Sequence, residues 1–289
     1  MLGDSHIHMI LDGVYYRAAI DAQKACPDEA LIRSRLAAYR EAGILFLRDG
    51  GDAWGVALRA AQLAPEYGIE YLTPAFPIHR NGRYGGFIGK GFEDMRQYRA
   101  RVDEAKAMGA DFIKIMISGL MDFNTYGQIT SSPLSAQEIR EMIHIAHEEG
   151  FSVMAHANGS ETVIAAAEAG VDSVEHGAYL NDEAVHALAE SGAVWTPTLV
   201  TVHNLIDDGR YPDSVLIPLE EYQLRQIALC VSIGGKIALG SDNGAYNVPH
   251  VQGTFDEMNC LKPALGENIQ AVLEAGEAEI RRRFRRRSK

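Results

Sequence analysis

Apolar runs alternate with longer amphipathic segments along the whole chain. Short runs rich in Val, Ile, Leu and Phe are each followed by an Ala-, Glu- and Arg-rich stretch with helical spacing. Eight such runs are found, at Leu2–His8, Ile44–Asp49, Glu70–Ala75, Asp111–Ile117, Phe151–His156, Ser173–His176, Val194–Thr198 and Lys236–Asp242. This alternation is typical of a parallel sheet whose strands are joined by helices, and eight units predict an α/β fold, a single (β/α)8 TIM barrel.

Glycines precede several of these runs, where a helix must end and the chain must turn into the next strand. They are Gly43, Gly68, Gly109, Gly150 and Gly192. A glycine after a helix readily adopts the left-handed conformation that makes this turn. The helix and strand boundaries therefore agree with the alternation of apolar and polar positions.

The longest irregular segments, residues 76–92 and 118–133, both follow predicted strands. Loops after strands form the active-site face of a barrel, so we expect them to act as lids or to contact the substrate. The segment NGRYGGFIGKG lacks the spacing of a phosphate-binding loop, and its glycines indicate a flexible loop instead.

Composition places the chain among globular proteins. It has 289 residues, 47% of them hydrophobic, and no apolar stretch approaches the roughly 18 residues of a membrane span. We expect one domain, residues 1–280, in a soluble protein of the cytoplasm with no leader segment. Cys26, Cys230 and Cys260 are widely spaced, so neither a disulfide framework nor a thiolate zinc site is indicated.

A basic tail, residues 281–289, contrasts with an acidic body. The net charge is −12, and residues 1–280 carry 20 basic against 39 acidic residues. This balance argues against nucleic acid or a membrane as a partner, although a basic tail by itself could bind either. We expect a solvated helix end whose arginines face the acidic body.

Polar side chains that could bind a metal stand at the carboxyl ends of the apolar runs. His6 and His8 close the first run in DSHIHM, two residues apart and therefore on one face of a strand. His156, His176 and Asp242 end the fifth, sixth and eighth runs. Each alone could be a hydrogen-bonded core residue or a turn cap, but their shared position favours one common site.

Lys114 lies in the apolar run DFIKIMIS, where an isolated ammonium is costly to bury. It could extend to the rim of the barrel and reach water. Alternatively, burial lowers its pKa and leaves a neutral amine that reacts with carbon dioxide, giving a carbamate that can bridge two metal ions. The neighbouring histidines favour the second interpretation.

The chain resembles the amidohydrolase superfamily, in particular its imidazolonepropionase-like and prolidase-like branch of metal-dependent hydrolases. The resemblance runs to about residue 258 through DSHIH, AGILFLRDGG, GADFIKIMISG, HEEGFSVMAHANG, AGVDSVEHGAYL, WTPTL and IALGSDNG. It implies two divalent metal ions, one bound by His6, His8 and Asp242 and the other by His156 and His176. Carboxylated Lys114 would bridge them.

The implied reaction is amide (C–N) hydrolysis in a dipeptide, an N-acyl amino acid or a cyclic amide, by attack of hydroxide activated by the metal. Asp242 is expected to transfer the proton, and His176 or a loop residue to stabilise the oxyanion. Imidazole and oxygen ligands without thiolate favour Zn²⁺, while Mn²⁺, Fe²⁺ or Co²⁺ would also fit.

The chain departs from the pattern of the superfamily in two places. The first ligands stand almost at Met1, which implies a barrel without most or all of the small β-sandwich of many members and leaves the contacts of any homo-oligomer open. The segment Gly85-Gly86-Phe87 replaces a Gly-Gly-His sequence that is frequent in relatives, so substrate specificity cannot be transferred.

Weaker candidates for contacts with a small-molecule substrate are His79, Arg80 and Arg83 in the loop after the third strand, Tyr126 after the fourth and His203 just beyond the seventh, all expected on the active-site face. Ordinary loop polarity is the alternative for each.

Three further features have mainly structural interpretations. Arg48 and Asp49 end the second run near the mouth of the barrel, where a structural ion pair is favoured at least as much as a catalytic role. Glu175 is expected to point away from the site, because neighbouring strand residues face opposite ways. His144 and His147 should cover the surface of an outer helix.

Three other functions compete with amide hydrolysis. A mononuclear hydrolytic deaminase needs no bridging lysine, so the state of Lys114 discriminates it. A lactone or phosphoester hydrolase would use much the same ligands. A catalytically silent binding barrel usually loses ligands, whereas all six positions are filled here.

Overall fold

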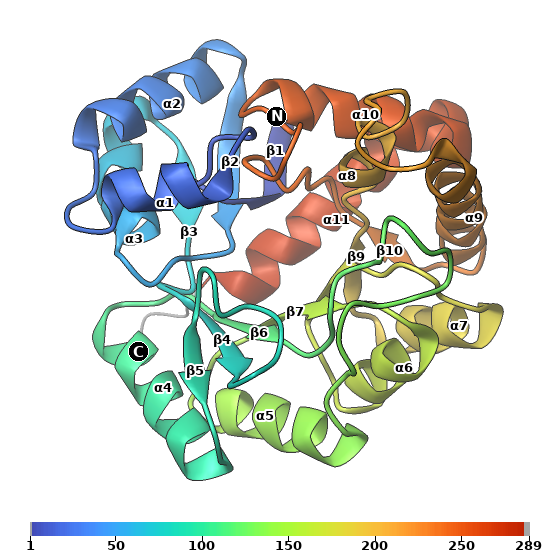
Figure 1. Ribbon diagram of the computed structural model, residues 1–289, viewed down its shortest axis with the longest axis horizontal. Helices are drawn as coiled ribbons and strands as arrows, with labels where there is room; N and C mark the ends of the chain where they lie inside the picture. The colour runs from blue at the N-terminus through green and yellow to red at the C-terminus, as the bar shows by residue number, and fades with distance from the viewer. Residues whose placement is uncertain (1, 286–289) are drawn as a thin grey trace.

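Parallel strands lie around the centre of the molecule and helices cover their outer side (Figure 1). The computed structural model describes residues 2–285. The strands are β1 (Leu2–Ile7), β2 (Ile44–Asp49), β3 (Glu70–Leu72), β4 (Pro77–Arg80), β5 (Lys90–Phe92), β6 (Ile113–Met116), β7 (Val153–Ala157), β8 (Ser173–His176), β9 (Val194–Thr196) and β10 (Lys236–Ile237). The α/β fold expected from the sequence is therefore present.

The strands form two parallel sheets. Their orders are β1-β2-β3 and β10-β9-β8-β7-β6-β4-β5. The chain after β10 runs beside β1, because the amide of Ser5 donates to the carbonyl of Leu239 (2.8 Å) and the amide of Asp242 to that of His6 (2.7 Å). Backbone hydrogen bonds thus join an edge of the second sheet to the first sheet.

Helices alternate with the strands and cover them. They are α1 (Tyr16–Gln23), α2 (Glu29–Glu41), α3 (Val56–Leu63), α4 (Met95–Ala107), α5 (Ala136–Glu148), α6 (Ser160–Glu168), α7 (Asp182–Ser191), α8 (Val200–His203), α9 (Asp213–Ser232), α10 (Gln252–Leu265) and α11 (Ile269–Phe284). Helix α5 shows the local logic, since Ser135 and Glu138 form a capping box at its start and Ile139, Met142 and Ile143 bury one face.

The segment 76–92, expected to be irregular, contains strands β4 and β5. The backbone bends at Ala75, whose φ is 63°, after β3 has paired with β2, and β4 then pairs with β6. His79 and Arg80 therefore lie in a strand, which corrects their expected place in a loop. The glycines serve close packing here, since a Cβ at Gly89 would lie 2.4 Å from the carbonyl oxygen of Pro77.

Helix α11 packs across the amino-terminal side of the strands. Ile280 and Phe284 join a buried cluster with Phe46, Phe112 and Met154. A Cβ at residue 276 of this helix would lie 1.9 Å from the carbonyl oxygen of Ile237, so glycine is required there for contact with β10.

The basic tail begins within α11, which contains the boundary expected at residue 280. Arg281 donates to Glu277 (2.8 Å), and Arg282 and Arg283 both donate to Glu279 (2.7 Å each). As expected, these arginines face carboxylates of the chain itself. Residues 286–289 of the tail lie outside the described residues.

Over residues 2–285, no helix combines the length and the apolar character that crossing a membrane requires. Cys26 is exposed, Cys230 and Cys260 are buried, and all three are free thiols, as the spacing predicts. His144 is exposed on α5 and pairs with Glu148 at 3.1 Å, which agrees with an outer helix surface.

Candidate active site

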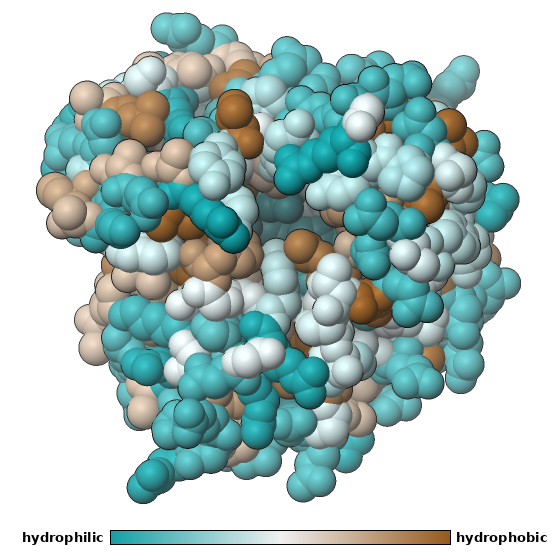
Figure 2. Space-filling model, in the orientation of Figure 1, coloured by the Kyte–Doolittle hydropathy of each residue, from teal (hydrophilic) through white to brown (hydrophobic). Residues whose placement is uncertain are grey.

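Histidines predicted from different strands come together at the carboxyl ends of the strands. The ring centroids of His6 and His8 lie 5.4 Å apart, those of His6 and His176 5.2 Å, and those of His156 and His176 4.6 Å. Asp242 joins them, because its Oδ1 lies 3.5 Å from Nε2 of His6 and 3.3 Å from Nε2 of His8. Figure 2 shows a hollow at the centre of the corresponding face.

Lys114 lies on β6, which pairs with β7, so that Lys114 is opposite Met154 and two residues along from the pair of Met116 and His156. Its side chain is buried, with 1% of the residue exposed. Burial is the main cause that lowers the pKa of the four clustered histidines, and the positive charge of Lys114 lowers it further; the same charge opposes the rise that burial causes in the pKa of Asp242. The lysine therefore faces the site and does not reach the rim.

Several buried polar atoms of this cluster lack a hydrogen-bond partner in the described part of the chain: Nε2 of His6, Nδ1 of His8, Nζ of Lys114 and Oδ1 of Asp242. Ligand atoms of His6, His8 and Asp242 all lie within 4.8 Å of one another. Buried polar atoms normally find partners, so the residues present fit a divalent cation.

Hydrogen bonds orient three of the imidazoles through one ring nitrogen each. Nδ1 of His6 lies 2.9 Å from Oε2 of Glu175, and Nδ1 of His176 lies 2.7 Å from Oγ1 of Thr198. Nε2 of His156 lies 3.1 Å from the carbonyl oxygen of Gly119. Histidines that bind metals are commonly held in this way through the nitrogen that does not bind.

Glu175 points into the core beneath the site, so the expectation that it faces away is wrong. Its Oε2 meets His6, and its Oε1 accepts from Nη2 of Arg48 at 2.9 Å. The alternation of a regular strand ends at His176, whose φ is 68°, which allows two consecutive side chains to serve one site. The sequence did contain a signal for this inward position, because Arg48 and Glu175 are oppositely charged residues within apolar strands.

Arg48 forms its ion pair with this glutamate and not with Asp49, its neighbour in sequence. Asp49 instead accepts hydrogen bonds from the amide of Met9 (2.8 Å) and the hydroxyl of Tyr71 (2.6 Å). The expected pairing of Arg48 with Asp49 is therefore corrected, because adjacent residues on a strand face opposite sides of the sheet.

Burial dominates the electrostatics of the site. It lowers the pKa of His8 and of His156 to about 3, so both imidazoles are neutral and able to bind a cation. It also lowers the pKa of Lys114, which favours the neutral amine. Burial raises the pKa of Asp242, and the nearby lysine opposes this rise.

The weaker substrate candidates lie in varied surroundings. Nη1 of Arg80 donates to Oε1 of Glu138 on α5 at 2.6 Å, and His203 pairs with Glu220 on α9 at 2.6 Å. Neither residue belongs to the cluster of potential metal ligands found among residues 2–285.

The other three candidates differ in exposure. His79 is buried in β4, Arg83 is exposed in a turn, and Tyr126 is 45% exposed with its ring 5.4 Å from that of Tyr179. The role of all these candidates in binding substrate stays a prediction.

Tyr84 is a residue of the site that the sequence analysis did not single out. Its ring centroid lies 4.6 Å from that of His156, and the charge of Asp242 adds to burial in raising its pKa. An aromatic residue inside a glycine-rich segment after the third strand was the signal that could have found it.

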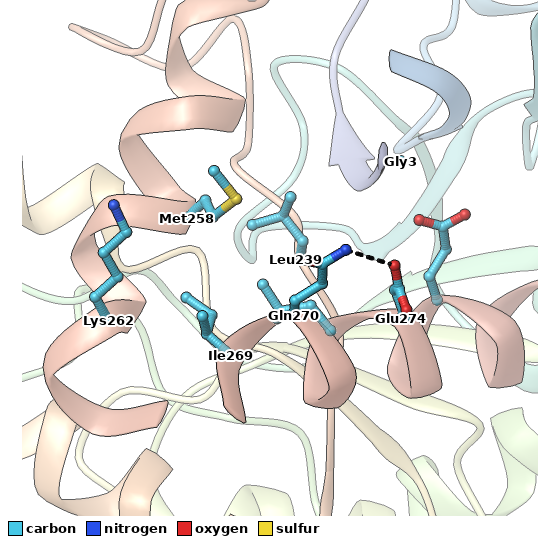
Figure 3. Close-up of a pocket in the computed structure, with 9 residues that line it drawn as sticks. Gly3, Leu239, Met258, Lys262, Ile269, Gln270 and Glu274 are labelled. Carbon is cyan, nitrogen blue, oxygen red and sulfur yellow. Dashed lines mark hydrogen bonds between the residues drawn. The ribbon is translucent and has the colours of Figure 1, made fainter. Parts of the chain in front are cut away.

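A separate hollow of about 380 Å³ lies between α10 and α11 (Figure 3). Its lining residues include Gly3, Leu239, Met258 and Leu273, and Gln270 donates to Glu274 at its edge (3.1 Å). The lining contains none of the clustered histidines, so this hollow is not part of the candidate active site.

The geometry agrees with one known family. The model of the amidohydrolase family matches residues 4–276, so the chain belongs to this family and the resemblance found in the sequence is confirmed.

Ochratoxinase of Aspergillus niger is 26% identical over 194 residues, which cover 64% of this chain and 38% of that protein. An uncharacterized protein of Mycobacterium tuberculosis is 26% identical over 226 residues, 75% of this chain and 58% of that one. The chain therefore spans less than two thirds of the length of these relatives.

Solved structures share the fold over nearly the whole chain. A Xaa-Pro dipeptidase with bound methionine in its active site has a TM-score of 0.76 at 20% identity, over 96% of this chain and 74% of its own. The crystal structure of A. niger ochratoxinase has a TM-score of 0.78 at 19% identity, over 96% of this chain and 71% of its own. At these identities the likeness concerns the fold.

Proposed function

We propose that this protein is a metal-dependent hydrolase that cleaves an amide C–N bond, with its site at the mouth of a closed (β/α)8 barrel. The observation that carries the proposal is the set of buried, unpartnered ligand atoms on His6, His8, Lys114 and Asp242. Membership in the amidohydrolase family supports the reaction class.

The residues divide into two groups of ligands. His6, His8 and Asp242, whose ligand atoms lie close together, would hold one divalent ion. His156 and His176 would hold a second, and Lys114 would connect the two after its neutral amine forms a bond to carbon dioxide and releases a proton. Imidazole and oxygen ligands favour Zn²⁺, with Mn²⁺, Fe²⁺ or Co²⁺ as alternatives.

Two bound divalent ions would lower the pKa of a water toward about 7 and polarise the scissile carbonyl. Asp242 would accept the proton of the attacking water and deliver it to the leaving nitrogen. In this role the carboxyl group would gain and lose one proton in each cycle. His176 would stabilise the oxyanion where it holds no ion; as a ligand, with Thr198 at its other ring nitrogen, it would leave this role to a loop residue.

The test combines metal content with substrate screening. The full chain is loaded with zinc or manganese in ¹³C-bicarbonate and assayed against dipeptides, N-acyl amino acids, cyclic amides and lactones. We expect two ions per chain, a carbamate resonance in the ¹³C spectrum and release of an amine. Loaded protein that leaves every amide intact would contradict the proposal, and turnover of lactones or phosphoesters alone would reassign the reaction.

A mononuclear hydrolytic deaminase is the second candidate. The close grouping of His6, His8 and Asp242 favours it. Within residues 2–285, these three form the group of at least three histidine, cysteine or carboxylate side chains close enough to hold one ion. One ion per chain, an unmodified Lys114 and release of ammonia would support this reading. Protein that holds its metal but is inactive on the whole panel would instead indicate a silent binding barrel.

We also propose a small-molecule substrate, a homo-oligomer and a cytoplasmic location. Light scattering of the purified chain tests the oligomer, and fractionation of the source cells tests the location. Neither property affects the assignment of the ligands.

A further inference from the structure

Aromatic rings form a continuous row from solvent to the candidate metal ligands. The ring of Tyr84 lies 4.6 Å from that of His156 with an interplanar angle of 35°, and 5.7 Å from that of Phe87. Phe87 in turn lies 5.4 Å from Tyr16, which is 39% exposed. We call Tyr16, Tyr84 and Phe87 the aromatic wall.

We infer that the aromatic wall is the subsite that binds an aromatic ring of the substrate, next to the amide to be cleaved. This inference rests on the proposed function, because it places the scissile bond at the cluster that contains His156. Tyr16 and Phe87 meet edge to face, with an interplanar angle of 74°, and this is an arrangement that a further ring would also adopt.

Exposure at the outer end supports binding over internal packing. Seven large apolar side chains are exposed among the residues with described side chains, and Val14, Tyr15 and Tyr16 are three of them, consecutive in the chain. Their exposed fractions are 70%, 54% and 39%. A contiguous apolar patch beside a site marks a binding surface more often than scattered exposed residues do.

The inner part of the wall is held in place before any ligand arrives. Ile88, next to Phe87, is buried, and its carbonyl accepts from the amide of Ala53 at 2.9 Å. A Cβ at Gly85, whose φ is 112°, would lie 2.8 Å from Cβ of His79, so the segment packs directly on β4. A preorganised surface loses less conformational entropy when it binds a ligand.

Arg17 contacts the outer end of the wall, at the hydroxyl and over the ring of Tyr16. Nε of Arg17 donates to the hydroxyl of Tyr16 at 3.0 Å, and its guanidinium carbon lies 5.5 Å from the centre of that ring. The substrate class that fits is an N-acyl amino acid or dipeptide that carries a flat aromatic group, in preference to its aliphatic counterpart.

The experiment uses benzylsuccinate and methylsuccinate, two dicarboxylates without an amide bond that differ by one aromatic ring. Calorimetry on the zinc-loaded full chain should show benzylsuccinate binding at least about tenfold tighter, because the ring buries apolar area against the wall. Phe87→Ala and Tyr16→Ala should each reduce this ratio severalfold. The control Met108→Ala, with the same 39% exposure at the end of α4, should leave it unchanged.

Tyr16→Ala keeps the test decisive if Phe87→Ala misfolds, since an exposed side chain contributes little to the fold. Equal binding of the two ligands, no detectable binding of benzylsuccinate, or an unchanged ratio in folded variants would overturn the inference. The measurement needs no turnover. Absence of amide hydrolysis would therefore contradict the proposed function, whereas the binding ratio alone tests the aromatic subsite.

Discussion

Two buried cations, Arg48 and Lys114, lie in neighbouring regions of the molecule but differ in their hydrogen bonding. Arg48, fully buried, donates to the carbonyl of Ser5 (2.6 Å), to Oγ of Ser173 (2.8 Å) and to Glu175 (2.9 Å). Lys114 is just as buried, yet its Nζ has no hydrogen-bond partner among the described residues.

This contrast separates the buried pair of Arg48 and Glu175 from the candidate active site around Lys114. A buried charge is costly unless it is paired and hydrogen-bonded, and the arginine meets this condition, with its guanidinium carbon also 4.5 Å from the ring centre of Phe284 on α11. The lysine does not, and unsatisfied buried groups are concentrated at functional sites. Glu175 connects the regions, because one oxygen meets Arg48 and the other meets His6.

The largest effect is expected on kcat, from a change in the cluster that contains Lys114 and Asp242. Asp242→Asn keeps the size of the side chain and an oxygen ligand but removes the group that transfers the proton. We expect the metal-loaded variant to lose about 10²–10⁴-fold in kcat. Amine release measured alongside metal content checks this, and a variant that holds its metal and turns over at a near-normal rate would exclude Asp242 from proton transfer.

The next largest effect is expected on stability, from a change in the buried pair of Arg48 and Glu175. Arg48→Met leaves Glu175 buried without its charged partner, so the free energy of unfolding should fall by about 3–5 kcal/mol. Urea titration of the metal-free protein measures it. The matched control is Arg59→Met, which breaks a half-exposed pair with Glu29 and should lower the free energy of unfolding far less, because water screens such a pair. Equal losses of unfolding free energy in the two variants would mean that Arg48 contributes no more to stability than a surface arginine does.

Glu175→Gln tests the residue that contacts both Arg48 and the candidate ligand His6. The amide can no longer accept as a carboxylate from the His6 ring, so the imidazole is less firmly oriented. We expect affinity for the metal to fall about 10–100-fold. Competition with a chelator measures it, with Glu138→Gln on the surface of α5 as the control. Unchanged affinity would mean that Glu175 serves the stability of the core alone.

The smallest effect concerns the pH dependence of Lys114. Burial lowers its pKa, so between that lowered value and about 10.4 the unfolded chain binds more protons than the folded one. The free energy of unfolding of the metal-free protein should therefore rise with pH in this window. Lys114→Met removes the titrating group, and the slope of wild type relative to this variant measures the effect. A flat difference between the two would indicate that the pKa is not lowered.

Much of the fold was predictable because its signals are local. The strand at Ile44–Asp49 was predicted to the residue, and so was the strand at Ser173–His176. Apolar runs set between helical segments specify such strands wherever the chain runs straight. The short strand β4 was missed, because the bend at Ala75 and the pairing with β6 depend on contacts distant in sequence.

The candidate site divides in the same way. Its histidines, Lys114 and Asp242 could be found because each ends or interrupts an apolar run, and strand ends meet in a parallel α/β fold. Glu175 was misjudged because alternation holds only within a regular strand, and the left-handed backbone of His176 ends it. Tyr84 was overlooked because glycine-rich composition conceals how tightly the segment packs.

By itself, the sequence determined the class of fold, the family and the candidate residues for binding metal, since these depend on period, residue type and order along the chain. The tertiary structure alone decided which buried charges are satisfied. Arg48 and Lys114 look alike in sequence, as single cations in apolar strands, and only the positions of Glu175, Ser173 and the aromatic rings distinguish them. Pairing depends on distances of a few ångströms between residues more than a hundred positions apart, which no local pattern encodes.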